Sequence, residues 1–242
     1  MAGVDPKYLE PLLGVVFDLD GTLILSNHAF PRMRHEVIRL AELYGVTPGK
    51  LSVDQTIPSL LETAVNELER LQTPEPTRFR FEAEVAHQID AIEMEALPTT
   101  RPRPGSAELL AALQDKGYRI AVLTRSSATF ARDALKQTGL LPFVAFIRSR
   151  SDSGPVKPDP EALLLVLRAL EVPPQRAVFV GDHLMDADCA ARAGVRFYAV
   201  LPTEPGKAGS DVDRFQAAGA AAVAPDLASL GRQLGVAPSA PA

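Results

Sequence analysis

The chain has 242 residues, which is enough for one large domain or two smaller ones. Its composition, 46% hydrophobic and 23% charged, is ordinary for a soluble globular protein. The formal net charge of -5 and the lack of a dense lysine and arginine block argue against a general nucleic-acid partner. The longest apolar segments, such as residues 12–17 and 162–167, are too short to cross a bilayer, so we expect no membrane partner.

The first residues do not have the pattern of a secretory signal peptide. Asp5, Lys7 and Glu10 lie where the apolar centre of such a peptide would be. Cys189 is the only cysteine, so no internal disulfide can form, and it is expected to be a buried packing residue. These features favour a cytoplasmic protein.

A short apolar run at residues 13–17 ends in two carboxylates one residue apart, Asp18 and Asp20, and Gly21 follows at once. An uninterrupted apolar run of this length indicates a strand that is buried on both faces, as in a parallel sheet. Ligands of open α/β sheets bind outside the carboxyl ends of the strands. We therefore expect both aspartates to lie in a tight turn at a binding site.

Residues 27–97 have a different pattern. Apolar residues recur at helical spacing in three stretches, and strand-like alternation is absent. Proline and glycine clusters at residues 45–49 and 73–77 separate the stretches. The segment is predicted to be an insert of three or four helices, with hinges at residues 25–27 and 98–104.

From residue 106 onward, predicted helices alternate with short apolar strands. The expected strands are residues 119–123, 144–147, 177–180, 196–200 and 220–224, and the expected helices are residues 107–116, 127–137, 160–170, 186–193 and 227–234. Such alternation indicates a parallel sheet with right-handed crossovers. The predicted fold is an α/β doubly wound parallel sheet, a Rossmann-like core formed by residues 1–25 and 98–235. Residues 26–97 are predicted to be a helical cap domain, and residues 236–242 a disordered tail.

Polar residues follow several of these strands. Two carboxylates after the first strand, together with Asp182 after a later one, could hold Mg²⁺, a cation that prefers oxygen ligands. The Thr124 hydroxyl and the free amides of the helix that begins near Arg125 suit a phosphate group, and Lys157 adds a positive charge. A metal, a phosphate corner, a cation and two carboxylates together are what phosphoryl transfer requires.

Four motifs resemble those of the haloacid-dehalogenase-like (HAD) hydrolases, in the family's order and over nearly the whole chain. They are Asp18-Leu19-Asp20-Gly21-Thr22, then Thr124, then Lys157-Pro158-Asp159-Pro160, and finally Gly181-Asp182 with Asp186. The helical insert directly after the first motif is similar to the cap of the phosphoglycolate-phosphatase-like branch. In that branch the cap closes over the site, excludes water and selects the substrate.

The resemblance implies a role for each matched residue. Asp18 would be the nucleophile that forms an aspartyl-phosphate, and Asp20 would be the general acid and then the general base. Thr124 would bind the phosphoryl group, and Lys157 would neutralise charge on that group and on Asp18. The carboxylates of Asp18 and Asp182, with the backbone carbonyl of Asp20, would be the metal ligands. Asp186 would act through a water or by orienting Lys157.

The expected activity is a Mg²⁺-dependent phosphatase for a small phosphorylated metabolite, of the phosphoglycolate or sugar-phosphate type. Asp20 favours a phosphatase or phosphomutase over a dehalogenase, because dehalogenases of this superfamily lack a carboxylate there. A sugar phosphomutase is an alternative, although Phe30 stands where mutases carry a histidine. A non-catalytic regulatory protein is another. The expected assembly is a monomer or a homodimer.

Some residues have more than one interpretation. Arg125 could contact the substrate or only a surface carboxylate, and Asp186 could simply cap its helix. His183 is expected to lie in a loop at the mouth of the site.

Overall fold

The structure is a computed structural model that describes residues 11–202 and 208–236. The chain divides into two compact units. The core unit consists of the segment up to Ser26 and the segment from Thr100 onward, and the insert unit is Asn27–Thr99.

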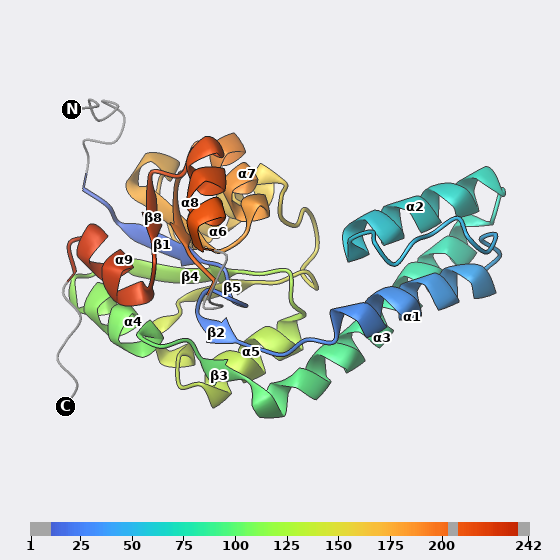
Figure 1. Ribbon diagram of the computed structural model, residues 1–242, viewed down its shortest axis with the longest axis horizontal. Coiled ribbons are helices and arrows are strands. Elements are labelled where there is room, and N and C mark those ends of the chain that lie inside the picture. The colour runs from blue at the N-terminus through green and yellow to red at the C-terminus, as the bar shows by residue number, and fades with distance from the viewer. Residues whose placement is uncertain (1–10, 203–207, 237–242) are drawn as a thin grey trace. The chain divides into compact units, whose positions relative to one another are not determined.

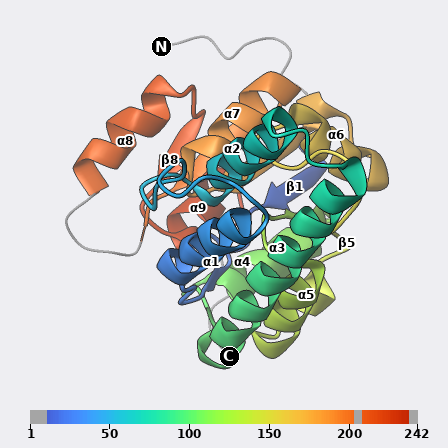
Figure 2. The same cartoon turned by 90° about the vertical axis from the view of Figure 1, so that its right-hand side faces the viewer.

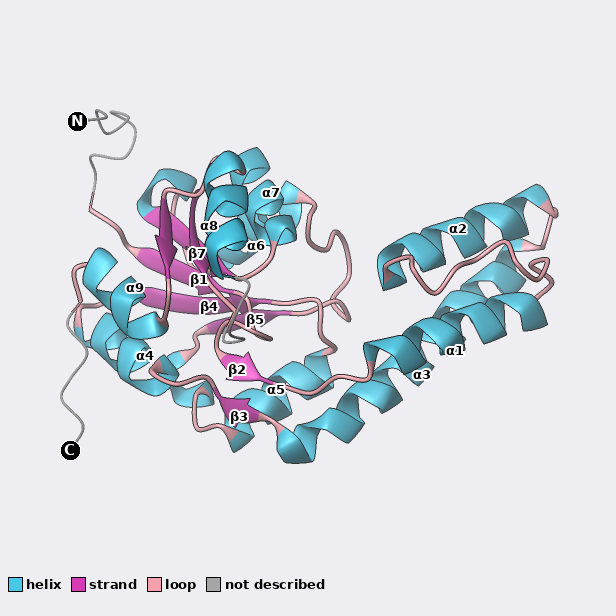
Figure 3. Cartoon of the chain, in the orientation of Figure 1, coloured by secondary structure: helices cyan, strands magenta, loops and turns pink. Residues whose placement is uncertain are grey.

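The core unit contains a six-stranded parallel sheet in the order β5-β4-β1-β6-β7-β8 (Figures 1 and 3). Its strands are β1 (Gly14–Phe17), β4 (Arg119–Leu123), β5 (Phe146–Arg148), β6 (Ala177–Gly181), β7 (Arg196–Val200) and β8 (Ala222–Ala224). All four residues of β1 are buried, as the uninterrupted apolar run predicts for a central strand. The expected doubly wound α/β fold is confirmed.

Helices cover both faces of this sheet. They are α4 (Ser106–Asp115), α5 (Ala128–Gln137), α6 (Pro160–Ala169), α7 (Leu184–Ala193), α8 (Ala208–Ala217) and α9 (Leu227–Gln233), with short 3-10 turns at Leu141–Phe143 and Pro174–Arg176. Helices α4, α5 and α9 lie on one face and α6, α7 and α8 on the other (Figure 1). Right-handed crossovers require this division, because the chain winds outward from β1 in one direction and then from β6 in the other.

The chain adds strands to one side of β1 and then, from β6 onward, to the other side. From β1 the chain proceeds to β4 and β5 on one side, and β6, β7 and β8 extend the sheet on the other. In open α/β sheets, ligands bind at such a switch point, at the carboxyl ends of the strands. Phe17 pairs with both Val122 and Val180, so the residues that follow these three strands emerge at the same edge.

The insert unit contains three helices, α1 (Phe30–Leu43), α2 (Ile57–Arg70) and α3 (Glu75–Ala96), and ends in the 3-10 turn Leu97–Thr99. The rings of Phe81 on α3 and Tyr44 after α1 lie 5.4 Å apart, and Phe81 is fully buried in a core to which all three helices contribute. This core contains the apolar residues whose spacing predicted the helices (Figure 2 shows the same helices from another side). It includes Met33, Val37, Leu40, Leu60, Ala64, Leu68, Val85, Ile89 and Ile92.

A two-stranded antiparallel ribbon marks where the chain leaves the core unit and returns to it. Strand β2 (Ile24–Leu25) pairs with β3 (Arg101–Pro102), with Ile24 opposite Pro102. The sequence pattern predicts hinges in these two segments but not their pairing, since two-residue strands have no periodicity to detect.

Several element boundaries differ from the expected ones. Strand β5 begins two residues later than predicted, and α7 begins two residues earlier. Val236, placed in the expected disordered tail, is buried and donates its N–H to the Gly231 carbonyl at 2.9 Å. Residues 237–242 lie outside the described residues. No helix among the described residues is long and apolar enough to cross a membrane.

Two phenylalanines on α3 provide a matched test of the insert core. Phe81 is fully buried, whereas Phe79 is 61% exposed. We expect Phe81→Ala to lower the free energy of unfolding by about 3–5 kcal/mol, because it removes a buried ring and leaves a cavity. Phe79→Ala should change it by less than about 0.5 kcal/mol. Urea unfolding followed by circular dichroism measures both, and equal effects would contradict this packing.

Candidate active site

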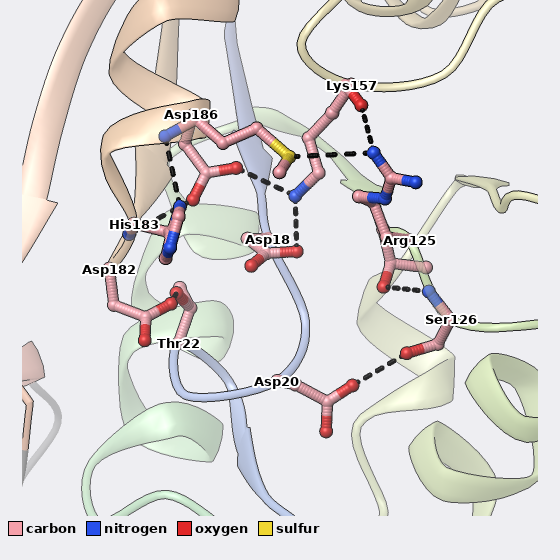
Figure 4. Close-up of polar contacts among 11 residues, drawn as sticks. Asp18, Asp20, Thr22, Arg125, Ser126, Lys157, Asp182, His183 and Asp186 are labelled. Atoms are coloured by element: carbon pink, nitrogen blue, oxygen red, sulfur yellow. Dashed lines mark hydrogen bonds and ion pairs between the residues drawn. The ribbon is translucent and has the colours of Figure 1, made fainter. Parts of the chain in front are cut away.

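The candidate active site lies where strands β1, β4 and β6 end. Asp18 follows β1, and its backbone N–H donates to the Val180 carbonyl at 2.8 Å, so β1 and β6 remain paired up to the first aspartate. Thr124 follows β4 and Asp182 follows β6. Figure 4 shows the side chains from these strand ends converging around Asp18. The parallel sheet thus gathers residues that are more than a hundred positions apart.

Lys157 lies at the centre of the charged groups. Its Nζ donates to Asp18 Oδ1 at 2.6 Å and to Asp186 Oδ1 at 2.8 Å (Figure 4). The lysine is 3% exposed, and its Nζ lies 5.5 Å from the centre of the Phe179 ring. Because burial permits little rearrangement, the ammonium group holds the two carboxylates at defined positions.

The carboxylates outnumber the ammonium group that faces them. Burial raises the pKa of Asp18 well above its usual range, and Asp186 and Asp182 add to this, while Lys157 opposes it. Burial, followed by the charge of Asp186, raises the pKa of Asp182 to about 6. Burial alone would lower the pKa of Lys157, but the carboxylates of Asp18 and Asp186 raise it above its ordinary value. The lysine therefore stays charged, and the cluster has a deficit of positive charge.

The turn after β1 leaves no room for a side chain at Gly21. Its φ is +79°, and a Cβ atom there would lie 2.1 Å from Asp182 Oδ2. The next residue, Thr22, is buried and donates its hydroxyl to Asp182 Oδ1 at 2.9 Å. A glycine and a small hydroxyl residue at these positions therefore place Asp182 against the first motif.

The carboxylate of Asp20 makes different contacts from that of Asp18. Ser126 Oγ donates to Asp20 Oδ2 at 2.7 Å, and Ser26 Oγ donates to Asp20 Oδ1 (Figure 4 shows the Ser126 contact). The side chain thus turns away from the cluster around Lys157. The atom of Asp20 that is predicted to bind a metal is therefore its backbone carbonyl oxygen, and this stays a prediction.

Thr124 and Arg125 lie between β4 and α5. Thr124 is buried, and its Oγ accepts the Ser126 N–H at 3.0 Å. Helix α5 begins at Ala128 with Ser127 as its N-cap, one residue later than the expected start at residue 127. Arg125 donates from Nη1 to the Lys157 carbonyl at 2.7 Å, so the residue after Thr124 holds the loop that carries Lys157.

The fourth motif runs from the end of β6 into the first turn of α7. His183 lies in the bend between them, as expected of a loop residue, and is the N-cap of α7, with its side chain accepting the Met185 N–H at 3.1 Å. Asp186 Oδ2 accepts the His183 N–H at 3.2 Å, while Oδ1 binds Lys157. Asp186 therefore caps α7 and also orients Lys157. Its contacts fit both roles considered from the sequence, the helix cap and the positioning of the lysine.

The donor set suits a hard divalent cation. Asp18, Asp182 and Asp186 each present a carboxylate oxygen, and these oxygens lie within 4.8 Å of one another. Oxygen ligands and excess negative charge are what Mg²⁺ and Ca²⁺ sites require. Lys157 binds one oxygen of Asp18 and one oxygen of Asp186, whereas the Asp182 carboxylate accepts the neutral Thr22 hydroxyl.

Sequence reasoning missed four supporting residues. It assigned no role to Ser126, Ser26 or Thr22, which bind the aspartates, nor to Arg103. Arg103 is 2% exposed and donates to the carbonyls of Gly21 and, at 2.6 Å, Leu201. Thr22 lay within a motif and could have been noted there. The contacts of Arg103 join segments 82 and 98 residues apart, for which the sequence has no local signal.

Cys189 is fully buried, as expected of a packing residue. Its Sγ lies 3.4 Å from the Asp159 carbonyl, and burial raises the pKa of the thiol to about 12. A thiol with such a pKa is not a nucleophile at neutral pH.

The core unit thus combines a doubly wound parallel sheet with a lysine-linked carboxylate cluster at its switch point. A family model described as haloacid dehalogenase-like hydrolase matches residues 12–194. The chain belongs to this family.

Similar proteins with curated names are phosphatases. The phosphoglycolate phosphatase of Thiobacillus denitrificans is 31% identical over 198 residues, which cover 78% of this chain and 83% of that protein. The pyrophosphatase PpaX of Bacillus pumilus is 30% identical over 187 residues, which cover 75% of this chain and 80% of that protein. The chain is therefore a phosphatase-type hydrolase of the phosphoglycolate-phosphatase-like branch, which confirms the resemblance and the expected enzyme class.

A solved structure shows the same fold. A HAD family hydrolase from Deinococcus radiodurans, with bound phosphate and sodium, matches with a TM-score of 0.60 and 22% identity. The match covers 95% of this chain and 99% of that one. At this identity the likeness establishes the shared fold alone.

The charge imbalance of the cluster predicts a pH-dependent effect on stability. Because the folded protein raises the pKa of Asp182 from 3.8 to about 6, folding favours its protonated form. This stabilisation is complete below the unfolded pKa and is lost as the pH rises through about 6. Asp182→Asn removes the ionised carboxylate and should therefore raise the free energy of unfolding of the metal-free protein. The increase should be larger at pH 7.5 than at pH 5 by about 1 kcal/mol. That corresponds to roughly 2–4 °C in Tm.

Thermal unfolding in the presence of a chelator measures this effect. Asp188→Asn is the control, since Asp188 is exposed and, within the described part of the chain, its ion pair is with Arg192, at 3.4 Å, on the same helix. The control should show no such growth between the two pH values. A Tm difference for Asp182→Asn that stays constant across this range would contradict the assigned charge imbalance.

Proposed function

We propose that the chain is a Mg²⁺-dependent phosphatase that hydrolyses a small phosphorylated metabolite through an aspartyl-phosphate on Asp18. The observation that carries the proposal is the 2.6 Å ion pair between Lys157 Nζ and Asp18 Oδ1, made beside the carboxylates of Asp182 and Asp186. A nucleophilic carboxylate must be ionised, and in this cluster Lys157 is the group that opposes the raised pKa of Asp18.

In the first step, Asp18 attacks the phosphorus and the bond from phosphorus to the leaving oxygen breaks. Lys157 neutralises charge on Asp18 and on the phosphoryl oxygens, and the Thr124 hydroxyl binds one of those oxygens. Asp18 and Asp182, with the Asp20 carbonyl, would hold Mg²⁺. When bound, the cation supplies positive charge that favours the ionised nucleophile and the developing charge on phosphate.

Asp20 transfers the protons in this scheme. In its protonated form it donates a proton to the leaving alcohol, and the resulting carboxylate then takes a proton from the water that hydrolyses the aspartyl-phosphate. Its contacts support a separate role from Asp18, because hydroxyl groups hold it, whereas Asp18 is bound by an ammonium group. The Ser126 and Ser26 hydroxyls orient the carboxylate for both steps.

The insert unit is proposed to be the cap that selects the substrate. It begins directly after the first motif, and the ribbon of β2 and β3 would be its hinge. The names of the two curated relatives include a phosphoglycolate phosphatase and a pyrophosphatase, so relatives of similar identity act on different small phosphates. We propose a phosphoglycolate-type or sugar-phosphate-type substrate for this chain.

The first test is phosphate release from p-nitrophenyl phosphate. We expect turnover that requires Mg²⁺ and stops on addition of a chelator, and Asp18→Asn should lower kcat at least about a thousandfold. Asp188→Asn removes an exposed carboxylate from α7 and serves as the control for charge. Turnover that persists in Asp18→Asn, or that does not depend on the metal, would contradict the mechanism.

The second test isolates the proton donor. A nitrophenolate ion leaves without a proton, whereas an alkoxide needs one, so Asp20→Asn should affect ethyl phosphate far more than p-nitrophenyl phosphate. The expected loss in kcat/KM for ethyl phosphate is about 10²–10⁴-fold. Ser126→Ala keeps the Asp20 carboxylate and removes one of its hydrogen bonds. It should lower kcat/KM less than Asp20→Asn does, and again more for ethyl phosphate than for p-nitrophenyl phosphate. Equal losses for both substrates would show that Asp20 is not the general acid.

A further inference from the structure

The turn of the first motif depends on two peptide planes that meet at Gly21. The Asp20 carbonyl and the Gly21 N–H belong to one plane, and the Gly21 carbonyl and the Thr22 N–H belong to the next. The φ of Gly21 is +79°, a conformation that glycine enters and leaves at little steric cost. Gly21 itself therefore does not fix the angle between the two planes, and contacts from outside the turn must hold it.

A hydrogen bond holds each of these planes. The Gly21 N–H donates to the Ile24 carbonyl at 2.9 Å, which fixes the direction of the Asp20 carbonyl on the opposite side of the same plane. The Gly21 carbonyl, in the second plane, accepts a hydrogen bond from Arg103 Nη1. Arg103 therefore restrains the rotation of the second plane relative to the first.

The second plane also determines where Thr22 points. The Thr22 hydroxyl donates to Asp182 Oδ1 at 2.9 Å, and its N–H donates to the Leu19 carbonyl at the longer distance of 3.3 Å (Figure 4 shows Thr22 beside Asp182). A rotation of this plane would move the hydroxyl that holds Asp182. The contact of Arg103 with the turn therefore bears on two of the groups predicted to bind the metal, the Asp20 carbonyl and the Asp182 carboxylate.

Arg103 is itself fixed by the surrounding fold. It is 2% exposed, and its Nη2 donates to the carbonyl of Leu201, whose own N–H donates to the Ala224 carbonyl of β8 at 2.9 Å. The Arg103 backbone N–H donates to the Leu23 carbonyl at 2.9 Å, and its carbonyl accepts the Ser106 N–H at 3.0 Å. The guanidinium group thus ties the first motif to the sheet through two of its nitrogens.

The charge of Arg103 would by itself disfavour a cation at this site. Burial lowers the pKa of its guanidinium, and the charge of Asp182, followed by that of Asp226, opposes this. Within the described part of the chain, no ion pair joins Arg103 to Asp182. A positive charge close to the site repels a divalent cation. If Arg103 acted through its charge alone, removing it would strengthen metal binding.

We propose that Arg103 is a positioning residue for the metal site, which keeps the Asp20 carbonyl and the Asp182 carboxylate at the spacing that a small cation requires. The inference rests on the proposed function, because it concerns the cation named there. Mg²⁺ requires near-ideal octahedral geometry, whereas Ca²⁺ accepts longer and less regular arrangements. A loosened turn therefore weakens Mg²⁺ binding more than Ca²⁺ binding, while a change in charge alone shifts both in the same direction.

Two variants separate geometry from charge. Arg103→Met removes the charge and both hydrogen bonds, whereas Arg103→Lys keeps the charge and replaces the two-nitrogen contact by a single nitrogen. Arg148→Met is the matched control. Arg148, at the end of the edge strand β5, is 7% exposed and also donates to two backbone carbonyls, those of Ser153 and Pro155, each at 3.0 Å.

The measurement is metal binding in the absence of substrate. Electron paramagnetic resonance distinguishes bound from free Mn²⁺, and competition with Mg²⁺ or Ca²⁺ gives the Kd of each cation. Circular dichroism shows whether each variant is folded at the temperature used. Asp182→Asn should weaken the binding of both cations, which assigns the binding to this site.

Arg103→Met should weaken Mg²⁺ binding by about 10–100-fold, as the loss of a group that orients metal ligands commonly does. The ratio of Mg²⁺ affinity to Ca²⁺ affinity should fall by about threefold or more, because Ca²⁺ tolerates the loosened turn. Arg103→Lys should lower this ratio by a smaller factor. Arg148→Met should leave the ratio unchanged, although it also removes a buried guanidinium group.

Three results would overturn the positioning role. The first is a ratio that neither Arg103 variant lowers. The second is tighter binding of both cations by Arg103→Met with unaltered binding by Arg103→Lys, which is the effect of charge alone. The third is an equal fall of the ratio in Arg148→Met, which would show a general loosening of the fold.

If Arg103→Met does not fold, the ratio in Arg103→Lys decides, and an unaltered ratio there overturns the role. If the unmodified protein binds neither cation, the metal-dependent function fails and the role of Arg103 fails with it. The three results above leave metal binding by the unmodified protein intact, so they contradict the role of Arg103 and not the proposed function.

Discussion

The ion pairs of Lys157 are the interaction on which the candidate site depends. One buried ammonium group binds Asp18 at 2.6 Å and Asp186 at 2.8 Å, and Asp182 lies in the same cluster. A buried pair of this kind contributes little net stability, because removing the charges from water costs about as much as their attraction returns. Its value is positional. It holds the Asp18 carboxylate in the orientation that the proposed nucleophilic attack needs.

The cluster exists because of the direction of the strands. Parallel strands end at one edge of the sheet, and the reversal of strand order between β1 and β6 leaves that edge open at its centre. Gly21 then allows Asp182 to approach the first motif, and Asp186 caps α7 while it binds the lysine. The surplus of negative charge is unfavourable for the metal-free fold, and it is also what would attract a divalent cation. Stability and function therefore oppose each other at this edge, as they commonly do at active sites.

The sequence by itself determined the class of fold and the residues with reactive groups. Strand and helix periodicity predicted the parallel sheet and the helical insert, and the spacing of Asp18, Asp20, Lys157 and Asp182 indicated the chemistry, because short motifs at strand ends are local patterns. Only the tertiary structure decided how those groups are paired. Ser126 and Ser26 hold Asp20, Arg103 joins the first motif to the end of β7, and Arg150 donates to the carbonyl of Arg125. Most of these contacts join residues that are tens of positions apart, and their partners are set by strand order and loop path, which leave no periodic trace in the chain.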